Sequence, residues 1–119
     1  MSVSCFYEEN LLRLESDLEK VMSKIESFEW NLCTYIFCGQ SICMSSRILI
    51  IDDELEEKRD DDDEPIYPIE KGYKNFLSVA DLQSVKSNLH EQKTDFSSRE
   101  LLSAVKYYYE NDAFIQINS

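Results

Sequence analysis

The chain has 119 residues, of which 43% are hydrophobic, and its formal net charge at pH 7 is −12. This length and composition indicate one globular domain, residues 1–119, with a single hydrophobic core. The acidic balance argues against direct binding to nucleic acid or to an anionic membrane, because both need clustered Lys and Arg.

The chain contains no uninterrupted apolar run of the roughly 20 residues that a membrane span needs. The first thirty residues carry seven carboxylates, which argues against a signal peptide. We therefore expect a soluble, cytoplasmic protein. In that reducing compartment, Cys5, Cys33, Cys38 and Cys43 are expected as buried thiols rather than disulfides or metal ligands.

Residues 8–28 show the apolar periodicity of an amphipathic helix. The apolar residues recur at alternating steps of three and four positions: Leu11, Leu14, Leu18, Val21, Ile25 and Phe28. This predicts an N-terminal helix with one buried face. Because the same spacing satisfies about three heptads, a coiled-coil dimer is an alternative.

Two segments favour strands. Residues 30–38 are rich in aromatic and β-branched side chains, although they could also extend the first helix. Residues 47–51 contain the run Ile48-Leu49-Ile50-Ile51, whose lack of alternation predicts a central strand or one covered on both faces.

Residues 52–64, here called the acidic segment, hold ten carboxylates and two cations, and so carry −8 of the net −12. Pro65-Ile66-Tyr67-Pro68 follows and predicts an extended, non-helical backbone. A long loop of this kind is either functional or a mobile, solvated connection. If it is held in place, its field can raise association rates with a basic partner by roughly 10–10³-fold.

Two C-terminal helices are predicted from their first residues. Ser78 with Asp81, and Ser97 with Glu100, have the spacing of a capping box, in which each side chain bonds the other residue's backbone N–H. The second helix is expected to end at Asn111-Asp112. Residues 113–117 alternate, which predicts a short last strand or a tail that packs on the core. The predicted fold is thus α+β: an N-terminal helix, a sheet of two or three strands, two C-terminal helices and a short last strand.

No pattern indicates catalysis. Two glycines cannot build a phosphate-binding loop, and a single histidine, His90, leaves little room for a Ser/His/Asp or Cys/His arrangement. The acidic segment lacks the glycine of a calcium loop. We expect no enzyme, no cofactor and no metal site. In Tyr107-Tyr108-Tyr109, at least one ring is expected to be exposed and available to a partner.

The stretches GYKNFLSVADLQSVKSNLHEQ (72–92) and LLSAVKYYYENDAFIQI (101–117) resemble small acidic immunity proteins of bacterial contact-dependent growth inhibition and related polymorphic-toxin systems. The resemblance implies a cytoplasmic protein that inhibits a toxin domain stoichiometrically. Such toxins are frequently nucleases, whose clefts are basic because their substrate is polyanionic.

The leading hypothesis is therefore a monomeric binding protein that neutralises a basic toxin domain through its acidic surface. Alternatives are a nucleic-acid-mimicking inhibitor of a host DNA- or RNA-binding protein, and a coiled-coil structural or adaptor protein. The predicted binding residues are the ten carboxylates and one aromatic anchor beside them: Asp52, Asp53, Glu54, Glu56, Glu57, Asp60, Asp61, Asp62, Asp63, Glu64 and Tyr67.

Overall fold

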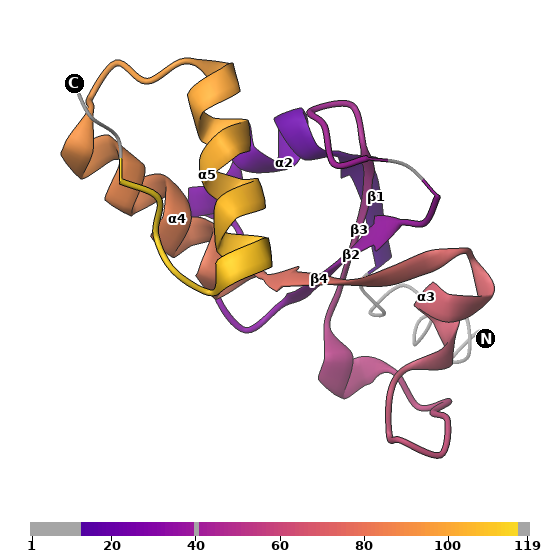
Figure 1. Ribbon diagram of the computed structural model, residues 1–119. Helices are drawn as coiled ribbons and strands as arrows, with labels where there is room; N and C mark the ends of the chain where they lie inside the picture. Colours follow the sequence, from indigo (N-terminus) through magenta and orange to yellow (C-terminus); the bar gives the residue numbers. More distant parts are fainter. Residues whose placement is uncertain (1–12, 40, 117–119) are drawn as a thin grey trace.

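The computed structural model describes residues 13–39 and 41–116 (Figure 1). Within these ranges the strands form one antiparallel four-stranded sheet in the order β1-β3-β2-β4. The strands are β1 (Arg13–Asp17), β2 (Cys33–Phe37), β3 (Arg47–Ile51) and β4 (Tyr73–Ser78). The α-helices are α2 (Leu18–Ser23), α3 (Ile66–Glu70), α4 (Val79–Gln92) and α5 (Ser98–Asn111), and two 3₁₀ turns are η1 (Ile25–Ser27) and η2 (Asp53–Leu55).

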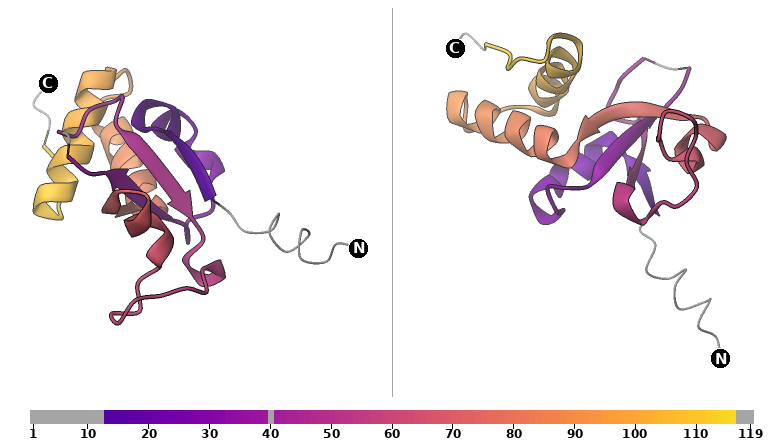
Figure 2. Two further views of the ribbon diagram at one scale, coloured as in Figure 1. Left: turned by 90° about the vertical axis from the view of Figure 1, so that its right-hand side faces the viewer. Right: turned by 90° about the horizontal axis from the view of Figure 1, so that it is seen from below.

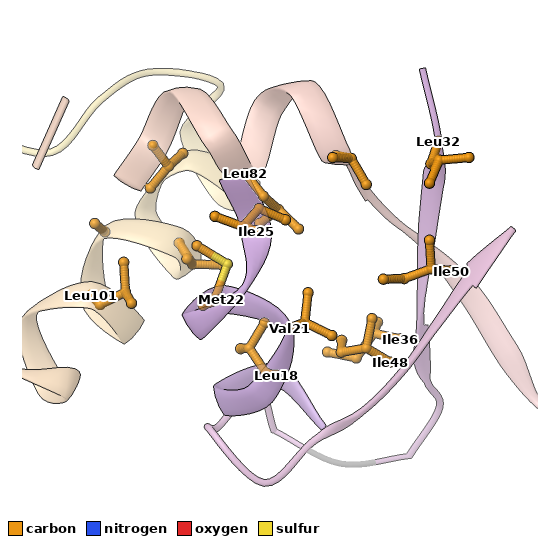
Figure 3. Close-up of a cluster of buried hydrophobic side chains, with 14 of the residues drawn as sticks. Leu18, Val21, Met22, Ile25, Leu32, Ile36, Ile48, Ile50, Leu82 and Leu101 are labelled. Atoms are coloured by element: carbon orange, nitrogen blue, oxygen red, sulfur yellow. The ribbon is translucent and has the colours of Figure 1, made fainter. Parts of the chain in front are cut away.

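Strand β3 is buried on both faces, as its apolar run predicted. Ile48 and Ile50 belong to the larger core, together with side chains of α2, α4 and α5 (Figure 3). Leu49 and Ile51 face the other way, into a smaller core with Tyr35 and Tyr73. These four apolar side chains of β3 are all 0% exposed, whereas Arg47 at its start is exposed. The prediction of a strand at 30–38 is also confirmed, by β2.

The two faces of the sheet are covered by different parts of the chain. Helices α4 and α5 lie together at one end of the molecule, and the acidic segment with α3 lies at the other (Figure 2). The larger core lies beneath α2, α4 and α5. Tyr67 of α3 packs against the smaller core. The acidic segment and α3, which come after β3 in the chain, therefore lie on the face of the sheet that carries the smaller core.

The prediction of a helix over 8–28 is wrong for residues 13–17, which form β1; residues 8–12 lie outside the described ranges. Helix α2 begins at Leu18, where the Asp17 carboxylate accepts a hydrogen bond from Lys20 N at 2.8 Å. The α-helix ends at Ser23 and the 3₁₀ turn η1 follows, so the predicted helix is shorter than expected at this end too. The predicted apolar positions Leu18, Val21 and Ile25 are nevertheless buried. The coiled-coil alternative loses its basis, because Leu14 lies in a strand.

The sheet has four strands where two or three were predicted, because residues 13–17 form β1 and residues 73–78 form β4. This strand pairs with β2, on the side away from β3. It ends at Ser78, which is also the N-cap of α4. The helix-start signal at Ser78 was correct, but the strand directly before it was missed.

The prediction of a non-helical backbone at 65–68 is also wrong. Pro65 is extended, with φ −60° and ψ 136°, but it is the N-cap of α3, which begins at Ile66. Pro68 is the third residue of that helix, in the first turn, where a backbone N–H has no partner within the helix. Proline is therefore tolerated at both positions.

Both C-terminal helices begin where predicted. The full capping box is present at Ser97 and Glu100. At Ser78, the hydroxyl accepts from Asp81 N at 3.0 Å, whereas the Asp81 carboxylate accepts from the Tyr108 hydroxyl at 3.3 Å.

The predicted last strand is absent from residues 113–116, and residue 117 lies outside the described ranges. The alternative holds: Ile115 packs on the larger core and its carbonyl accepts a hydrogen bond from Gln92 Nε2 at 2.9 Å.

Candidate partner-binding surface

The acidic segment is folded over much of its length. After β3 ends, the Asp52 carboxylate accepts a hydrogen bond from Glu54 N at 3.1 Å and starts the turn η2. The chain then doubles back: Ile66 N donates to the Lys58 carbonyl at 3.0 Å, and Asp60 N donates to the Glu64 carbonyl at 2.9 Å. These bonds close a hairpin whose tip is residues 60–64.

The tip is a tight turn that Asp60 holds together. One carboxylate oxygen of Asp60 accepts from Asp62 N at 2.9 Å and from Glu64 N at 3.0 Å. Asp63 has a positive φ of 63°, which aspartate tolerates better than most residues. Asp60 therefore serves the structure of the loop as well as its charge.

Arg59 lies inside the acidic segment and contacts three of its carbonyl groups. Its guanidinium donates to the Glu56 carbonyl at 3.1 Å, to the Asp63 carbonyl at 2.8 Å and to the Asp53 carbonyl. It also pairs with the carboxylates of Asp53 at 3.4 Å and Asp63 at 3.8 Å. The hydrogen bond to Asp53 is the main cause of a raised Arg59 pKa.

A second arginine joins the segment to the sheet. Arg13 of β1 donates two hydrogen bonds, each 3.0 Å long, to the two carboxylate oxygens of Glu56. Its guanidinium carbon also lies 3.8 Å from the centroid of the Tyr67 ring, which is a cation–π distance. The hydrogen bond to Glu56 is the main cause of a raised Arg13 pKa.

The ten predicted carboxylates therefore have different environments. Glu56 is only 4% exposed and is fully engaged by Arg13, so it is part of the fold rather than of the surface. Asp52 and Asp53 are half-buried. The remaining seven are exposed, and we call them the exposed carboxylates: Glu54, Glu57, Asp60, Asp61, Asp62, Asp63 and Glu64.

The predicted aromatic anchor, Tyr67, is half-buried and packs on the smaller core. Besides Arg13, the Lys71 ammonium lies 5.7 Å from its ring centroid. The Tyr67 ring is therefore engaged in contacts within the protein itself. Apolar side chains that are more open to a partner nearby are Leu55, 42% exposed, and Ile69, 56% exposed.

The charge of the segment acts on the sheet beneath it. Burial is the main cause of raised pKa values at the Cys33 thiol and the Tyr35 hydroxyl. The negative charges of Asp53 and Glu64 raise both pKa values further. The thiol of Cys33 and the hydroxyl of Tyr35 are therefore kept neutral near pH 7, and neither is poised as a nucleophile.

The other residues considered from the sequence lie elsewhere. His90 is exposed, and its ring lies edge-on to the Phe96 ring, with 6.4 Å between the ring centroids. Tyr107 is 40% exposed, while Tyr108 and Tyr109 pack against Phe114 and Phe76. Over the described residues, no three His, Cys, Asp or Glu side chains gather in a way that could hold a metal ion.

Sequence reasoning missed Arg13 and Arg59 as organisers of this surface. Arg59 carried a signal, since it is one of only two cations among ten carboxylates and so has many possible partners within the loop. Arg13 carried none, because its partner Glu56 is 43 positions away and the intervening fold brings them together.

Fold and surface together define a small α+β domain that presents a folded acidic loop at one end. The carboxylates of this loop are exposed, half-buried or paired with Arg13 or Arg59. None of the helices in the described ranges is long and apolar enough to cross a membrane.

The chain belongs to the family described as a domain of unknown function (DUF7716), whose model matches residues 15–117. Comparison with curated proteins gave no match, and comparison with solved structures gave none either.

Proposed function

We propose that this protein is a cytoplasmic immunity protein, which binds a basic toxin domain and neutralises it by stoichiometric inhibition. The observation that carries the proposal is the acidic segment, which is folded and fixed to the sheet and presents seven exposed carboxylates at one end of the domain. The partner class and the toxin context come from the resemblance of residues 72–92 and 101–117 to immunity proteins.

The segment is suited to such a partner in two respects. Its net charge of −8 within 13 residues creates a concentrated negative field, which speeds encounter with a basic surface and disfavours acidic competitors. Leu55 lies within the same segment and exposes 42% of its surface, so it can supply the apolar contact that charge alone does not.

If the toxin is a nuclease, the carboxylates would occupy positions where substrate phosphates otherwise bind. The immunity protein then needs no reaction of its own, and we propose that it acts as a monomer in a one-to-one complex.

The test uses the purified C-terminal domain of the protein encoded directly upstream of this gene, which the proposal expects to be the toxin. A loop variant carries Glu57→Gln, Asp61→Asn and Asp62→Asn, three exposed carboxylates that make no hydrogen bond or ion pair with any other residue that the structure describes. A matched control carries Glu19→Gln, Asp95→Asn and Glu110→Gln, which are exposed and outside the acidic segment. Each variant removes three negative charges.

In stopped-flow experiments at low salt, we expect the loop variant to associate about tenfold more slowly than the wild type, with a weaker salt dependence. The control should change by less than about twofold. Equal effects of both variants would show that only the net charge matters. Failure of the wild type to bind the toxin domain, or binding to a host nucleic-acid-binding protein in its place, would contradict the proposal.

A further inference from the structure

Arg59 is more buried within the acidic segment than the neighbouring cation, Lys58. It accounts for one of the two cations in the segment, and its neighbour Lys58 has the same charge. Among the described residues, the exposed side chain of Lys58 makes no hydrogen bond or ion pair, whereas the side chain of Arg59 is only 22% exposed. The two adjacent cations therefore have different roles.

The contacts of Arg59 join both halves of the loop. The carbonyls of Asp53 and Glu56 lie before it in the chain and the carbonyl of Asp63 lies after it, and the guanidinium donates to all three. A planar guanidinium can reach several acceptors at fixed angles, which the single ammonium of lysine cannot do. Arg59 thus fixes the turn η2 relative to the tip at 60–64.

The loop needs such a cation, because its carboxylates repel one another at close range. Without the guanidinium, the carbonyls of Glu56 and Asp63 would lose this donor, whereas the carbonyl of Asp53 would keep the Glu56 N–H at 3.2 Å. The carboxylates of Asp53 and Asp63 would also lose this counter-charge. The hydrogen bonds of the hairpin would then be the contacts left to oppose this repulsion at the tip.

We infer that Arg59 is a positioning residue that holds the acidic segment folded before any partner arrives, so that the exposed carboxylates are presented in one arrangement. The inference rests on the proposed function for its consequence, which is tight binding. A loop ordered in advance does not lose its conformational entropy on binding, so the gain is expected in slower dissociation.

Charge-matched variants distinguish a positioning role of Arg59 from an effect of its charge alone. Arg59→Gln and Lys58→Gln each change the net charge from −12 to −13, so a field effect predicts equal or faster association for both. Positioning predicts instead that only Arg59→Gln weakens the complex. A third variant, Arg59→Lys, keeps the charge and removes the planar fork.

The first measurement is amide hydrogen exchange by NMR in the free protein, which needs no partner. It follows the hydrogen-bonded amides of the hairpin, namely those of Asp60, Asp62, Asp63, Glu64 and Ile66. In Arg59→Gln and Arg59→Lys we expect exchange at least about tenfold faster at these amides, with β3 amides unchanged. Lys58→Gln should match the wild type. Wild-type exchange in Arg59→Gln would overturn the inference.

The second measurement is dissociation from the upstream-encoded toxin domain. We expect Arg59→Gln to dissociate at least about tenfold faster than Lys58→Gln, without slower association. Equal dissociation rates would overturn the positioning role even if exchange were faster. If the wild type does not bind this domain, the proposed function fails while the exchange experiment still decides whether Arg59 orders the loop.

Discussion

The two glycines of the chain adopt the same backbone conformation in different surroundings. Gly39 has φ +89° and Gly72 has φ +88°, a region that side chains other than glycine rarely occupy. A Cβ atom on Gly39 would meet nothing within 4 Å, whereas one on Gly72 would lie 3.1 Å from Cε1 of Phe37. The pair separates the cost of backbone conformation from that of a steric contact.

We expect Gly39→Ala to lower the free energy of unfolding by about 1 kcal/mol, which is the conformational term. Gly72→Ala should lower it by roughly 1 kcal/mol more, because the Phe37 ring, which packs edge-on against Tyr73 at 5.5 Å, has to move. Urea unfolding of both variants checks this. Equal losses would show that Phe37 moves aside without cost.

Glu56 shows how a single residue can look different in the sequence and in the fold. It lies among nine other carboxylates of the acidic segment and has the same side chain as Glu54 and Glu57, which are exposed. Its burial follows from Arg13 on a strand 43 positions earlier. Such long-range pairing leaves no local pattern, so the surface could be predicted as a segment but not residue by residue.

At the scale of elements, local sequence patterns correctly predicted a strand and the starts of two helices. The apolar run Ile48–Ile51 identified β3, and the serine caps located the first residues of α4 and α5. These elements depend on burial and capping, which neighbouring residues encode directly.

Strands β1 and β4 were not predicted, because tertiary pairing determines them. Residues 13–17 fit a helical period through Leu14 and Leu18, yet β3 takes them as its neighbour, with Leu14 opposite Ile50. Residues 73–78 end at Ser78, a strong helix cap, and this signal hid the strand that pairs with β2. In both cases the partner strand, distant in sequence, overrides local propensity.

The capping box of α5 makes a contribution to stability that depends on pH. The Glu100 carboxylate accepts from Ser97 N at 2.8 Å, which is the main cause of its lowered pKa, and it accepts from the Lys93 ammonium at 2.9 Å. Because the folded-state pKa lies below the unfolded one, the unfolded chain binds more protons as the pH falls. The stabilisation is complete above the unfolded pKa of about 4.3 and is lost as the pH falls through the folded pKa.

We therefore expect Glu100→Gln to be less stable than the wild type at pH 6, and this difference to shrink steadily below about pH 4.3. Urea unfolding of both proteins at a series of pH values measures it. Ser103→Ala, an exposed and non-titrating change on the same helix, is the control, and its difference from the wild type should not vary with pH. A difference for Glu100→Gln that grows in acid would contradict the assignment.

At the scale of the whole molecule, charge is distributed very unevenly. The acidic segment carries −8, which leaves −4 on the other 106 residues. Arg13 and Arg59 offset part of the repulsion, but the exposed carboxylates at the tip have no cation of their own beyond Arg59 among the described contacts. Such a concentration of like charge is expected to lower the stability of the free fold.

This predicts that the double variant Asp61→Asn and Asp62→Asn is more stable than the wild type in low salt, by up to about 1 kcal/mol. Within residues 13–39 and 41–116, neither carboxylate makes a hydrogen bond or ion pair, so we expect the change mainly to remove repulsion. In 1 M NaCl, where the Debye length is about 3 Å, the gain should nearly vanish. Urea unfolding at the two salt concentrations measures both values.

The control for that experiment is Asp95→Asn with Glu110→Gln, which removes the same charge from outside the acidic segment and should give a smaller gain. The double variant removes two of the three charges that the loop variant removes, so it too is expected to associate more slowly with a basic partner. Its stability and its binding should therefore change in opposite directions. A double variant that is no more stable than the wild type in low salt would show that Arg59 and Arg13 already neutralise the repulsion within the segment. The exposed carboxylates would then lower the stability of the free protein no more than acidic residues elsewhere on its surface.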